Sequence, residues 1–325
     1  MEPNTLTTNN EVSVGVLAGP TILLKDAWNL FKSHWKVFIM IAAVPSVISI
    51  AGQLLVNIPI PIIAGILAFI LIVAAIIFSI YMQGALIDTI RKYSENPMAV
   101  ISVKEQYSFG FKYFWSFLLV ILIESLVVFG SFSLFVIPGI IVAIYVSFYT
   151  MTLFVDDKRG FSALTESFSL VKGRWWGVLG RFLILGLVMF AVYIVVAILS
   201  FLIASVVGDS IVTTILILLI NLALGVVIGP FAIAYMYKLY ESLKATRSTG
   251  VMTSSFKKWL IAFLCVGIVA PIVIIGVLSS VVLVSLNTAR MKGEEARIKA
   301  TLMQQQLQQE IDTGMQGSEE VPVTQ

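Results

Sequence analysis

The protein is a chain of 325 residues, of which 59% are hydrophobic and 12% are charged, with a formal net charge of +3. Its mean hydropathy of +1.00 excludes an ordinary soluble domain, because one core could not hide so much apolar surface from water. The small basic excess gives no reason to expect nucleic-acid binding. A single cysteine, Cys265, excludes an intrachain disulfide and a cysteine-based metal cluster.

Seven apolar runs are each long enough to cross a bilayer as a helix of about 20 residues. Because an apolar segment in lipid must satisfy its own backbone hydrogen bonds, these runs predict helices and not strands. The expected fold is an all-α, polytopic helical membrane protein, with Pro138 and Gly139 separating the third and fourth spans. The runs lie near residues 37–57, 62–87, 114–135, 136–155, 182–207, 211–237 and 259–286.

Charged residues gather in alternate connections between these runs. The connections NIPIPI, SFSLFVIPG and SVVGDSI contain no Lys or Arg, whereas all 17 basic residues up to Lys258 lie on the other side. Short basic loops stay in the cytoplasm, so that side and the N-terminus are predicted to be inside the cytoplasmic (inner) membrane, with the C-terminus outside. Residues 1–20 lack the basic start of a cleavable signal peptide and are expected to form a polar, mobile tail.

A motif of Lys followed three residues later by Trp recurs in FKSHW, FKYFW and VKGRW, each time before an apolar run. LKDAWNLFKSHW aligns with LTESFSLVKGRW, which predicts an internal repeat. Each copy is expected to form an amphipathic helix at the membrane interface, followed by a two-span hairpin. A six-span bundle over residues 21–250 would then contain units at about 21–100, 101–160 and 161–250. The predicted interface anchors are Lys32, Trp35, Lys112, Trp115, Lys172 and Trp175.

In the first copy, helical spacing places the apolar residues on one stripe and the lysines opposite. The third copy has an equivalent stripe that includes Leu164, Phe168 and Val171. The predicted stripe of the first copy is Leu24, Ala27, Trp28, Phe31 and Trp35.

The stretches VIPGIIVAIY and LFVDDKRGFSALTESFSLVKGRWW resemble the six-span membrane domain fused to some glycerophosphodiester phosphodiesterases, and related uncharacterised bacterial membrane proteins. Pro138, Gly139, Asp156 and Trp175 are among the shared elements, over about residues 20–245. The resemblance implies a fold, since that membrane domain has no settled activity of its own. The phosphodiesterase chemistry does not carry over, because it needs a histidine pair and the chain has one histidine, His34.

The stretch GVLSSVVLVSLNTARMKGEEARIKATLMQ is similar to the N-terminal helix of type IV pilins. The alignment places Phe263 at the first mature position, but Ala262 stands where the processing glycine is expected, and Gly267 where the fifth-position glutamate is expected. The resemblance implies an uncleaved pilin-like helix, retained as a seventh transmembrane helix with a helical extension over residues 256–312. Residues 313–325 are expected to be disordered. The extension carries an apolar stripe of Ala289, Ala296, Ala300, Met303, Leu307 and Ile311.

Glu124 is the one acidic residue deep inside a predicted span, where a carboxylate is costly and should face the bundle interior. A proton relay, a substrate contact and a protonated hydrogen bond between helices remain open as its role. Its expected partners are Asn221, Gln53 or Tyr193, of which Asn221 and Gln53 are further polar candidates within the membrane.

Two pairs of small residues have the four-residue spacing that allows helices to approach closely in lipid. They are Gly225 with Gly229, and Gly276 with Ser280. Packing within the bundle is the expected role, with dimerisation as the alternative.

No nucleophile triad, phosphate-binding glycine loop or metal-ligand spacing is recognisable, so neither enzyme activity nor a cofactor is expected. The first hypothesis is a non-catalytic scaffold or assembly factor that packs against partner membrane helices through its bundle and pilin-like helix. The alternative is a transporter or lipid-handling protein that uses Glu124 and the interfacial Lys/Trp helices. Membrane lipids and other membrane or pilin-like proteins are the candidate partners.

Overall fold

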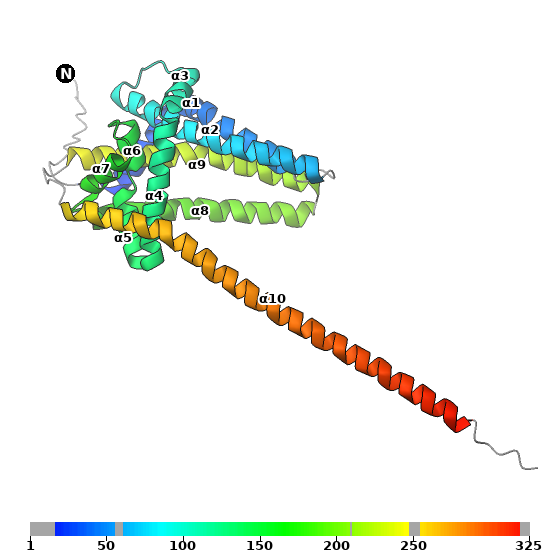
Figure 1. Ribbon diagram of the computed structural model, residues 1–325. Coiled ribbons are helices and arrows are strands. Elements are labelled where there is room, and N and C mark those ends of the chain that lie inside the picture. Colours follow the sequence, from blue (N-terminus) through cyan, green and yellow to red (C-terminus); the bar gives the residue numbers. More distant parts are fainter. Residues whose placement is uncertain (1–16, 56–60, 209, 247–253, 319–325) are drawn as a thin grey trace, which may run out of the picture. The chain divides into compact units, whose positions relative to one another are not determined.

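A computed structural model describes residues 17–55, 61–208, 210–246 and 254–318 (Figure 1). Every regular element in these residues is a helix, and seven helical segments are long and apolar enough to cross a membrane. The prediction of an all-α, multi-pass membrane protein is therefore confirmed. The chain divides into two compact units, Met1–Gly267 and Ile268–Gln325, each of which is considered by itself.

The described residues form ten helices. In chain order they are α1 (Pro20–Leu55), α2 (Pro61–Glu95), α3 (Val103–Lys112), α4 (Phe114–Leu134), α5 (Val136–Val146), α6 (Tyr149–Phe154), α7 (Phe161–Val171), α8 (Trp175–Val207), α9 (Ile211–Ala245) and α10 (Ser254–Ser318). Where a long helix ends at a connection without Lys or Arg, its terminus agrees closely with the end of the predicted apolar run. At their other ends, where the charged residues lie, several helices continue beyond the apolar run. Water can solvate the polar side chains of these extra turns, so the helix does not have to end where hydrophobicity does.

Three lead-in segments precede long helices, and each ends in a break next to the Lys-to-Trp motif. The breaks lie at His34 inside α1 (φ −125°, ψ 22°), at Tyr113 between α3 and α4 (φ −94°, ψ 0°), and at Arg174 between α7 and α8 (φ −129°, ψ 18°). These dihedral angles depart from the regular helix and lie in or near the bridge region of backbone conformation. Each lead-in segment therefore ends before the regular long helix begins.

The core of the first unit lies among the lead-in segments and the charged ends of the long helices. Leu23 in α1 is 2% exposed, and Leu164 and Val171 in α7 are fully buried. α1 packs against α2 and α9, while α7 packs against α5, α6 and α9. α7 is thus enclosed by other parts of the protein, where a helix lying free on the membrane surface was expected.

The buried face of the first lead-in segment is rotated from the predicted stripe. Of the residues on the predicted apolar stripe, Ala27 and Phe31 are buried in the protein, whereas Trp28 and Trp35 are 50% and 47% exposed; Leu23, which is not on that stripe, is also buried. Amphipathic spacing separates apolar from polar residues, but it does not say which apolar residues meet protein and which meet lipid.

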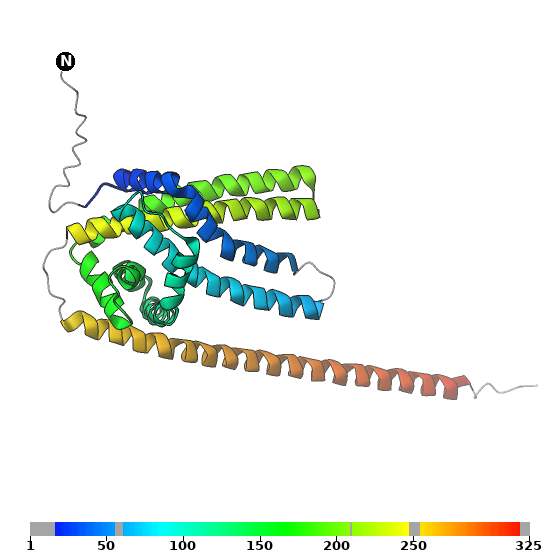
Figure 2. The ribbon, with the colours of Figure 1, turned by 90° about the horizontal axis from the view of Figure 1, so that it is seen from above.

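Two long hairpins, α1–α2 and α8–α9, extend in the same direction from this core (Figures 1 and 2). Apolar side chains cover their outer surfaces; for example, Phe69, Leu187 and Phe201 are 67%, 67% and 72% exposed. The backbone polar groups are paired inside the helices, so lipid is a suitable solvent for these surfaces.

α4 and α5 run across the direction of the two long hairpins. α4 stands nearly upright in Figure 1, and both helices are viewed close to end-on in Figure 2. The apolar segment that follows α4 is also divided, because Ser147 and Phe148 separate α5 from α6. The three predicted hairpins therefore do not share one direction, which hydropathy alone could not reveal.

Pro45 lies inside α1 and leaves a backbone carbonyl that α3 can bind. Proline has no backbone N–H, so the carbonyl of Ile41 loses its usual helical donor. The Tyr107 hydroxyl donates to this carbonyl at 2.6 Å. Burial raises the pKa of Tyr107 from its ordinary value, already above neutral pH, to about 12.

The second unit consists of the remainder of α10. Its side chains are mostly exposed where described, including Val273 (56%), Leu283 (67%) and Met303 (67%). The helix continues to Ser318, so the expectation of disorder from residue 313 is wrong for residues 313–318, while 319–325 lie outside the described residues. The segment 301–313 contains five Gln, two Leu, one Met and one Glu, which are good helix formers.

Candidate functional site

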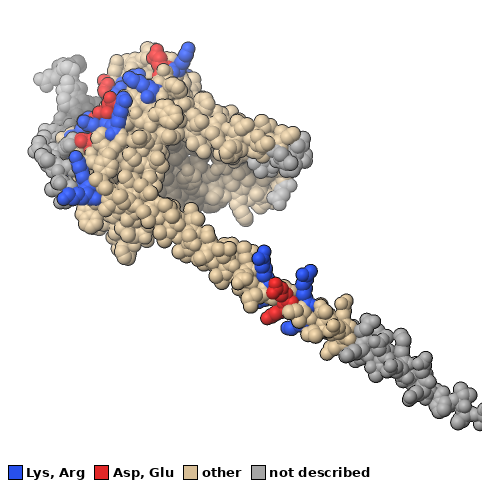
Figure 3. Space-filling view, in the orientation of Figure 1, with Lys and Arg blue, Asp and Glu red and all other residues tan. Residues whose placement is uncertain are grey.

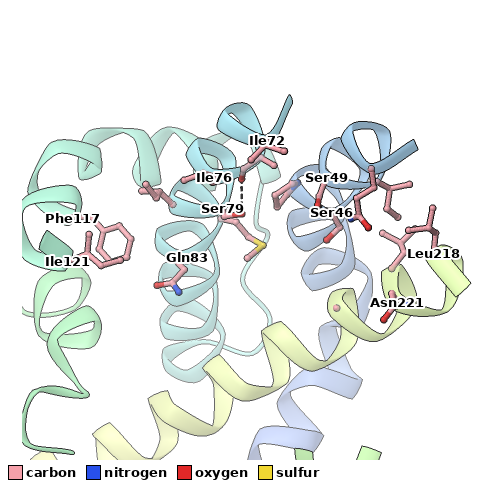
Figure 4. A pocket seen from close by; sticks show the side chains of 18 of the residues that line it. Ser46, Ser49, Ile72, Ile76, Ser79, Gln83, Phe117, Ile121, Leu218 and Asn221 are labelled. Atoms are coloured by element: carbon pink, nitrogen blue, oxygen red, sulfur yellow. Dashed lines mark hydrogen bonds between the residues drawn. The ribbon is translucent and has the colours of Figure 1, made fainter. Parts of the chain in front are cut away.

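A groove of about 800 Å³ opens between α1, α2, α9 and the first turns of α4 (Figure 4). Its wall is mainly apolar, with Ile72, Phe117 and Leu218 among the lining residues. No charged side chain lines it in the part of the chain that is described. The polar lining residues are Ser46, Ser49, Gln53, Ser79, Gln83 and Asn221.

The spacing of these polar residues explains why they converge. Ser46, Ser49 and Gln53 follow one another at intervals of three and four along α1, so they share one helix face. Ser79 and Gln83 do the same on α2. These two polar faces and Asn221 of α9 line the same groove, and this periodicity is a sequence signal that could have located it.

Most donors in the groove bind within their own helix. The Ser46 hydroxyl donates to the carbonyl of Ala42 at 2.8 Å, and the Asn221 amide donates to that of Ile217 at 2.8 Å. The Gln53 amide donates to Ser49 Oγ at 3.3 Å. These bonds satisfy side-chain hydroxyl and amide donors for which lipid hydrocarbon has no acceptor. They leave the amide oxygens of Gln53 and Asn221 without a donor among the described residues.

Gln83 differs from its neighbours in the groove. Its side-chain amide makes no hydrogen bond to any described residue, and the side chain is partly exposed. It therefore brings both a donor and an acceptor to the groove wall.

Glu124 makes no hydrogen bond to any of its predicted partners among the described residues. Gln53 and Asn221 make the local bonds given above, and Tyr193 is 54% exposed on α8. Glu124 is partly buried on α4 and lies near enough to Tyr149 to interact with it electrostatically. Gln53 and Asn221 line the groove, whereas Glu124 is not among its lining residues, although Ile121, one turn before it on α4, is.

Charged side chains gather at one end of the first unit, around the core (Figure 3). The carboxylate of Asp88 is buried and lies 2.5 Å from Arg91 and 2.8 Å from Lys92. With its amide oriented to satisfy both neighbours, Gln106 of α3 donates to Asp88 at 2.7 Å and accepts from Lys92 at 2.8 Å. The network neutralises a buried charge and fastens α3 to α2.

Two further ionic contacts join α9 to its neighbours. The Tyr240 hydroxyl and the Lys244 ammonium both donate to the carboxylate of Asp156 at 2.6 Å. Lys238 bridges Glu241 at 2.8 Å and Ser94 at 2.6 Å. These groups are engaged in holding segments together.

Two arginines bind backbone carbonyls at the charged end. Arg181 donates to the carbonyls of Ala18 at 2.8 Å and Leu17 at 2.9 Å, which holds the chain just before α1. Arg174 donates to the carbonyls of Leu170 at 3.0 Å and Leu243 at 3.2 Å, near the ends of α7 and α9. A cationic side chain suits such carbonyls because they lack helical donors. These roles require a contact across the fold, and sequence reasoning missed them.

The predicted interface anchors lie at or near the breaks that precede the long helices. Trp35 and Trp115 are 47% and 76% exposed. Trp175 is partly buried, and its ring nitrogen donates to the carbonyl of Ile141 at 3.3 Å. Lys32 and Lys112 are exposed, whereas Lys172 is partly buried. Anchoring in lipid remains a prediction.

The predicted small-residue pairs do not mediate close packing within the described part of the chain. No described atom lies within 4 Å of a Cβ built at Gly225, Gly229 or Gly276, apart from the helix's own adjacent backbone. The Ser280 hydroxyl donates to the carbonyl of Val277 in its own helix at 2.8 Å. Packing through these glycines is therefore not seen among the described residues, where other glycines lie at the close crossings.

Helices approach each other most closely at Gly110, Gly130 and Gly267. A Cβ at Gly110 would lie 2.4 Å from the carbonyl oxygen of Tyr81, where α3 meets α2. A Cβ at Gly130 would lie 2.0 Å from the oxygen of Phe263, and one at Gly267 would lie 1.9 Å from the oxygen of Leu126. The start of α10 thus touches α4 backbone to backbone. The glycine at position 267, which departs from the pilin pattern, is required by this contact.

No group of three or more His, Cys, Asp or Glu side chains that could hold a metal ion occurs in the described segments. Residues 98–243 match a family model described as Domain of unknown function (DUF7847). The match covers less than half of the chain and runs from just before α3 to near the end of α9. Neither the curated proteins nor the solved structures contain a match to this chain.

Proposed function

We propose that the protein is a non-catalytic scaffold or assembly factor of the cytoplasmic membrane, and that it packs against a partner helix through α10. The observation that carries the proposal is the continuation of α10 beyond its apolar part to Ser318 as one helix. Met291 and Ile298 in this extension are both 59% exposed. A helix standing alone in water is marginally stable, so a long extension with exposed apolar side chains favours a partner.

The extension has the pattern of a coiled-coil seam. Small and apolar residues recur at alternating intervals of four and three, which keeps one face toward a partner helix. Their small size would allow close approach. The seam residues in the described side chains are Ala289, Gly293, Ala296, Ala300 and Met303.

Basic residues flank this seam on both sides. Arg290 and Arg297 occupy one flank, and Lys292 and Lys299 occupy the other. In a parallel pair of identical helices the two flanks would meet with like charge, which opposes self-association. The seam therefore favours a different helix whose flanking positions are acidic. The resemblance to pilins adds support for a partner from an appendage of that kind.

The charge distribution supports the orientation. Lys and Arg cluster at the core end of the first unit, and the positive-inside bias therefore supports a cytoplasmic location for this end. The α4–α5 segment leaves and returns to this end whether or not it crosses the bilayer, so it does not alter the assignment. α10 then carries its extension outside. The matching backbone angles at His34 and Arg174 also support the predicted repeat.

A photoreactive amino acid scanned along residues 289–303 tests the scaffold proposal in cells. Adduct formation with one protein partner should peak at Ala289, Ala296, Ala300 and Met303, and fall at the opposite positions Glu294 and Ile298. Replacing Arg297 and Lys299 together by glutamate should abolish the adduct, while replacing them by glutamine should weaken it. Equal yields at every position, or adducts with lipid alone, would contradict the proposal.

Transport driven by titration of Glu124 receives less support, because this side chain is not among the residues that line the groove. The Glu124→Gln variant decides the matter. If the protein moves a substrate by proton exchange at Glu124, the variant should lose that movement; if Glu124 has a packing role, the variant should keep the activity of the unaltered protein.

A further inference from the structure

α4 and α5 lie across the two long hairpins (Figures 1 and 2), so their depth in the membrane follows from the points at which they touch neighbouring helices. Each neighbour carries a marker, which is the charged residue that bounds its apolar run. On α2 this residue is Asp88, and on α10 it is Lys258. Because a helix rises about 1.5 Å per residue, the number of residues from the marker gives the greatest depth that a contact can have.

The start of α4 lies at a shallow level. The ring of Phe117 packs against that of Phe154, with 5.3 Å between the ring centroids. Phe154 in turn lies against Gly84 of α2, where an added Cβ would be 2.8 Å from the phenylalanine ring. Gly84 is four residues from Asp88, or about 6 Å along the helix. The first turns of α4 are therefore close to the charged end.

The later part of α4 lies at a similar level. The backbone of α4 at Leu126 and Gly130 meets the backbone of α10 at Gly267 and Phe263, all within the first unit. Phe263 and Gly267 follow Lys258 by five and nine residues, or about 8 and 14 Å. The crossing therefore lies in the nearer half of a hydrocarbon layer that is about 30 Å thick.

The lengths of α4 and α5 do not fit a hairpin that crosses the membrane. From Phe117 to Gly130, α4 advances 13 residues, or about 20 Å, yet the contact at Gly130 is at most about 8 Å from the marker on α10. α5 (Val136–Val146) has 11 residues, or about 16 Å, and is too short to return across the hydrocarbon. Leu153 of the following α6 is already buried in the core.

The tip between α4 and α5 is apolar and unpartnered among the described residues. Phe135, Val136 and Ile137 are 74%, 64% and 72% exposed. No charged residue stands between Glu124 and Asp156. A patch of this kind is unfavourable in water and suits hydrocarbon. Its position beside the shallow part of the long helices makes acyl chains the available hydrocarbon.

The same arrangement accounts for Glu124, which lies on α4 between the two groups of contacts. In a crossing helix its carboxylate would be near the bilayer centre, where a charge is costly. In a helix that lies along the membrane plane near the charged end, the carboxylate is within reach of the headgroup region.

We propose that α4 and α5 form a re-entrant hairpin that stays within the leaflet at the charged end, and that its tip, residues 132–137, is surrounded by acyl chains of that leaflet. The helices that cross the bilayer are then α1, α2, α8, α9 and α10. This inference depends neither on which side of the membrane the charged end faces nor on the scaffold proposal for α10.

Single cysteines in the full-length Cys265→Ser protein test the proposal in sealed vesicles of both orientations. Ser133→Cys places a thiol at the tip, Ser210→Cys marks the uncharged end and Lys158→Cys marks the charged end; all three positions are exposed. An impermeant maleimide should label positions 158 and 210 from opposite sides. From either side it should label position 133 at least about tenfold more slowly, because a thiol in hydrocarbon is not ionised and meets no aqueous reagent. After denaturation the three should react equally.

A fluorescent bimane at position 133 should also be quenched by nitroxide-labelled phospholipids and not by iodide in the water. Labelling of position 133 from the same side as position 210 would overturn the proposal, because the hairpin would then cross the membrane. Labelling from the same side as position 158 would place the tip in water and would also overturn it. A bimane that neither nitroxide lipid nor iodide quenches would show that protein covers the tip, which contradicts the proposal as well.

Discussion

Substitution of Gly267 by alanine tests the backbone contact between α10 and α4. The added Cβ would lie 1.9 Å from the Leu126 carbonyl oxygen, about 1.5 Å short of the 3.4 Å at which ordinary contact begins. Backbone atoms cannot rotate away as a side chain can, so the two helices must separate. Overpacking of this kind costs about 3 kcal/mol at the upper end of its usual range. Alanine recovers about 1 kcal/mol as the better helix former, which leaves a net loss of about 2 kcal/mol.

The assay is thermal unfolding in detergent, followed by tryptophan fluorescence. A loss of about 2 kcal/mol should lower the midpoint by about 4 °C. Gly186 in α8 is the matched control, because it is exposed and a Cβ there meets nothing within 4 Å. Gly186→Ala should leave the midpoint unchanged or raise it slightly.

Gly267→Glu restores the residue that the pilin pattern expects and should destabilise the protein more than Gly267→Ala, because a longer, charged side chain must enter the same crossing. If Gly267→Ala unfolds at the same temperature as Gly186→Ala, the helices are not in backbone contact and the reasoning is refuted.

Three further substitutions test the contacts at the charged end. Tyr107→Phe leaves the carbonyl of Ile41 without its donor and should cost about 1 to 3 kcal/mol, seen as a lower unfolding midpoint than that of the exposed control Tyr193→Phe. Arg181→Gln should release the residues before α1, seen as faster proteolysis near Ala18 with the rest of the chain resistant. Asp88→Asn should destabilise by about 3 kcal/mol in chemical unfolding, because two cations lose their buried carboxylate. Unchanged stability of the Tyr107 or Asp88 variant, or unchanged proteolysis of the Arg181 variant, would contradict the assigned contact.

The sequence predicts the helical segments well because hydropathy reports directly on which residues tolerate lipid. The apolar run predicted at 114–135 is α4 (Phe114–Leu134), and the next run contains α5 and α6. The direction of a helix in the bundle is not predictable in this way. A helix that runs parallel to the long hairpins and one that runs across them, as α4 and α5 do, can have the same apolar composition. The rotation of the buried face at Trp28 has a similar origin, because an indole ring is compatible with both protein and lipid.

The candidate site was only partly predictable. Gln53 and Asn221 stand out as polar residues in apolar runs, and both line the groove. Their association with Glu124 could not be tested from one sequence, since helix order in a bundle depends on contacts between distant segments. The glycines show the same limit: the spacing of Gly225 and Gly229 is visible in the sequence, whereas the crossing at Gly267 depends on where α4 lies.

The most direct test of the account is the accessibility of single cysteines in intact cells, in a Cys265→Ser background. Lys158→Cys lies at the charged end of the first unit, and Thr301→Cys lies in the extension of α10. A membrane-impermeant maleimide should label position 301 in intact cells and position 158 after the membrane is opened. Labelling of both positions from the same side, or recovery of the protein in the soluble fraction without detergent, would contradict the account.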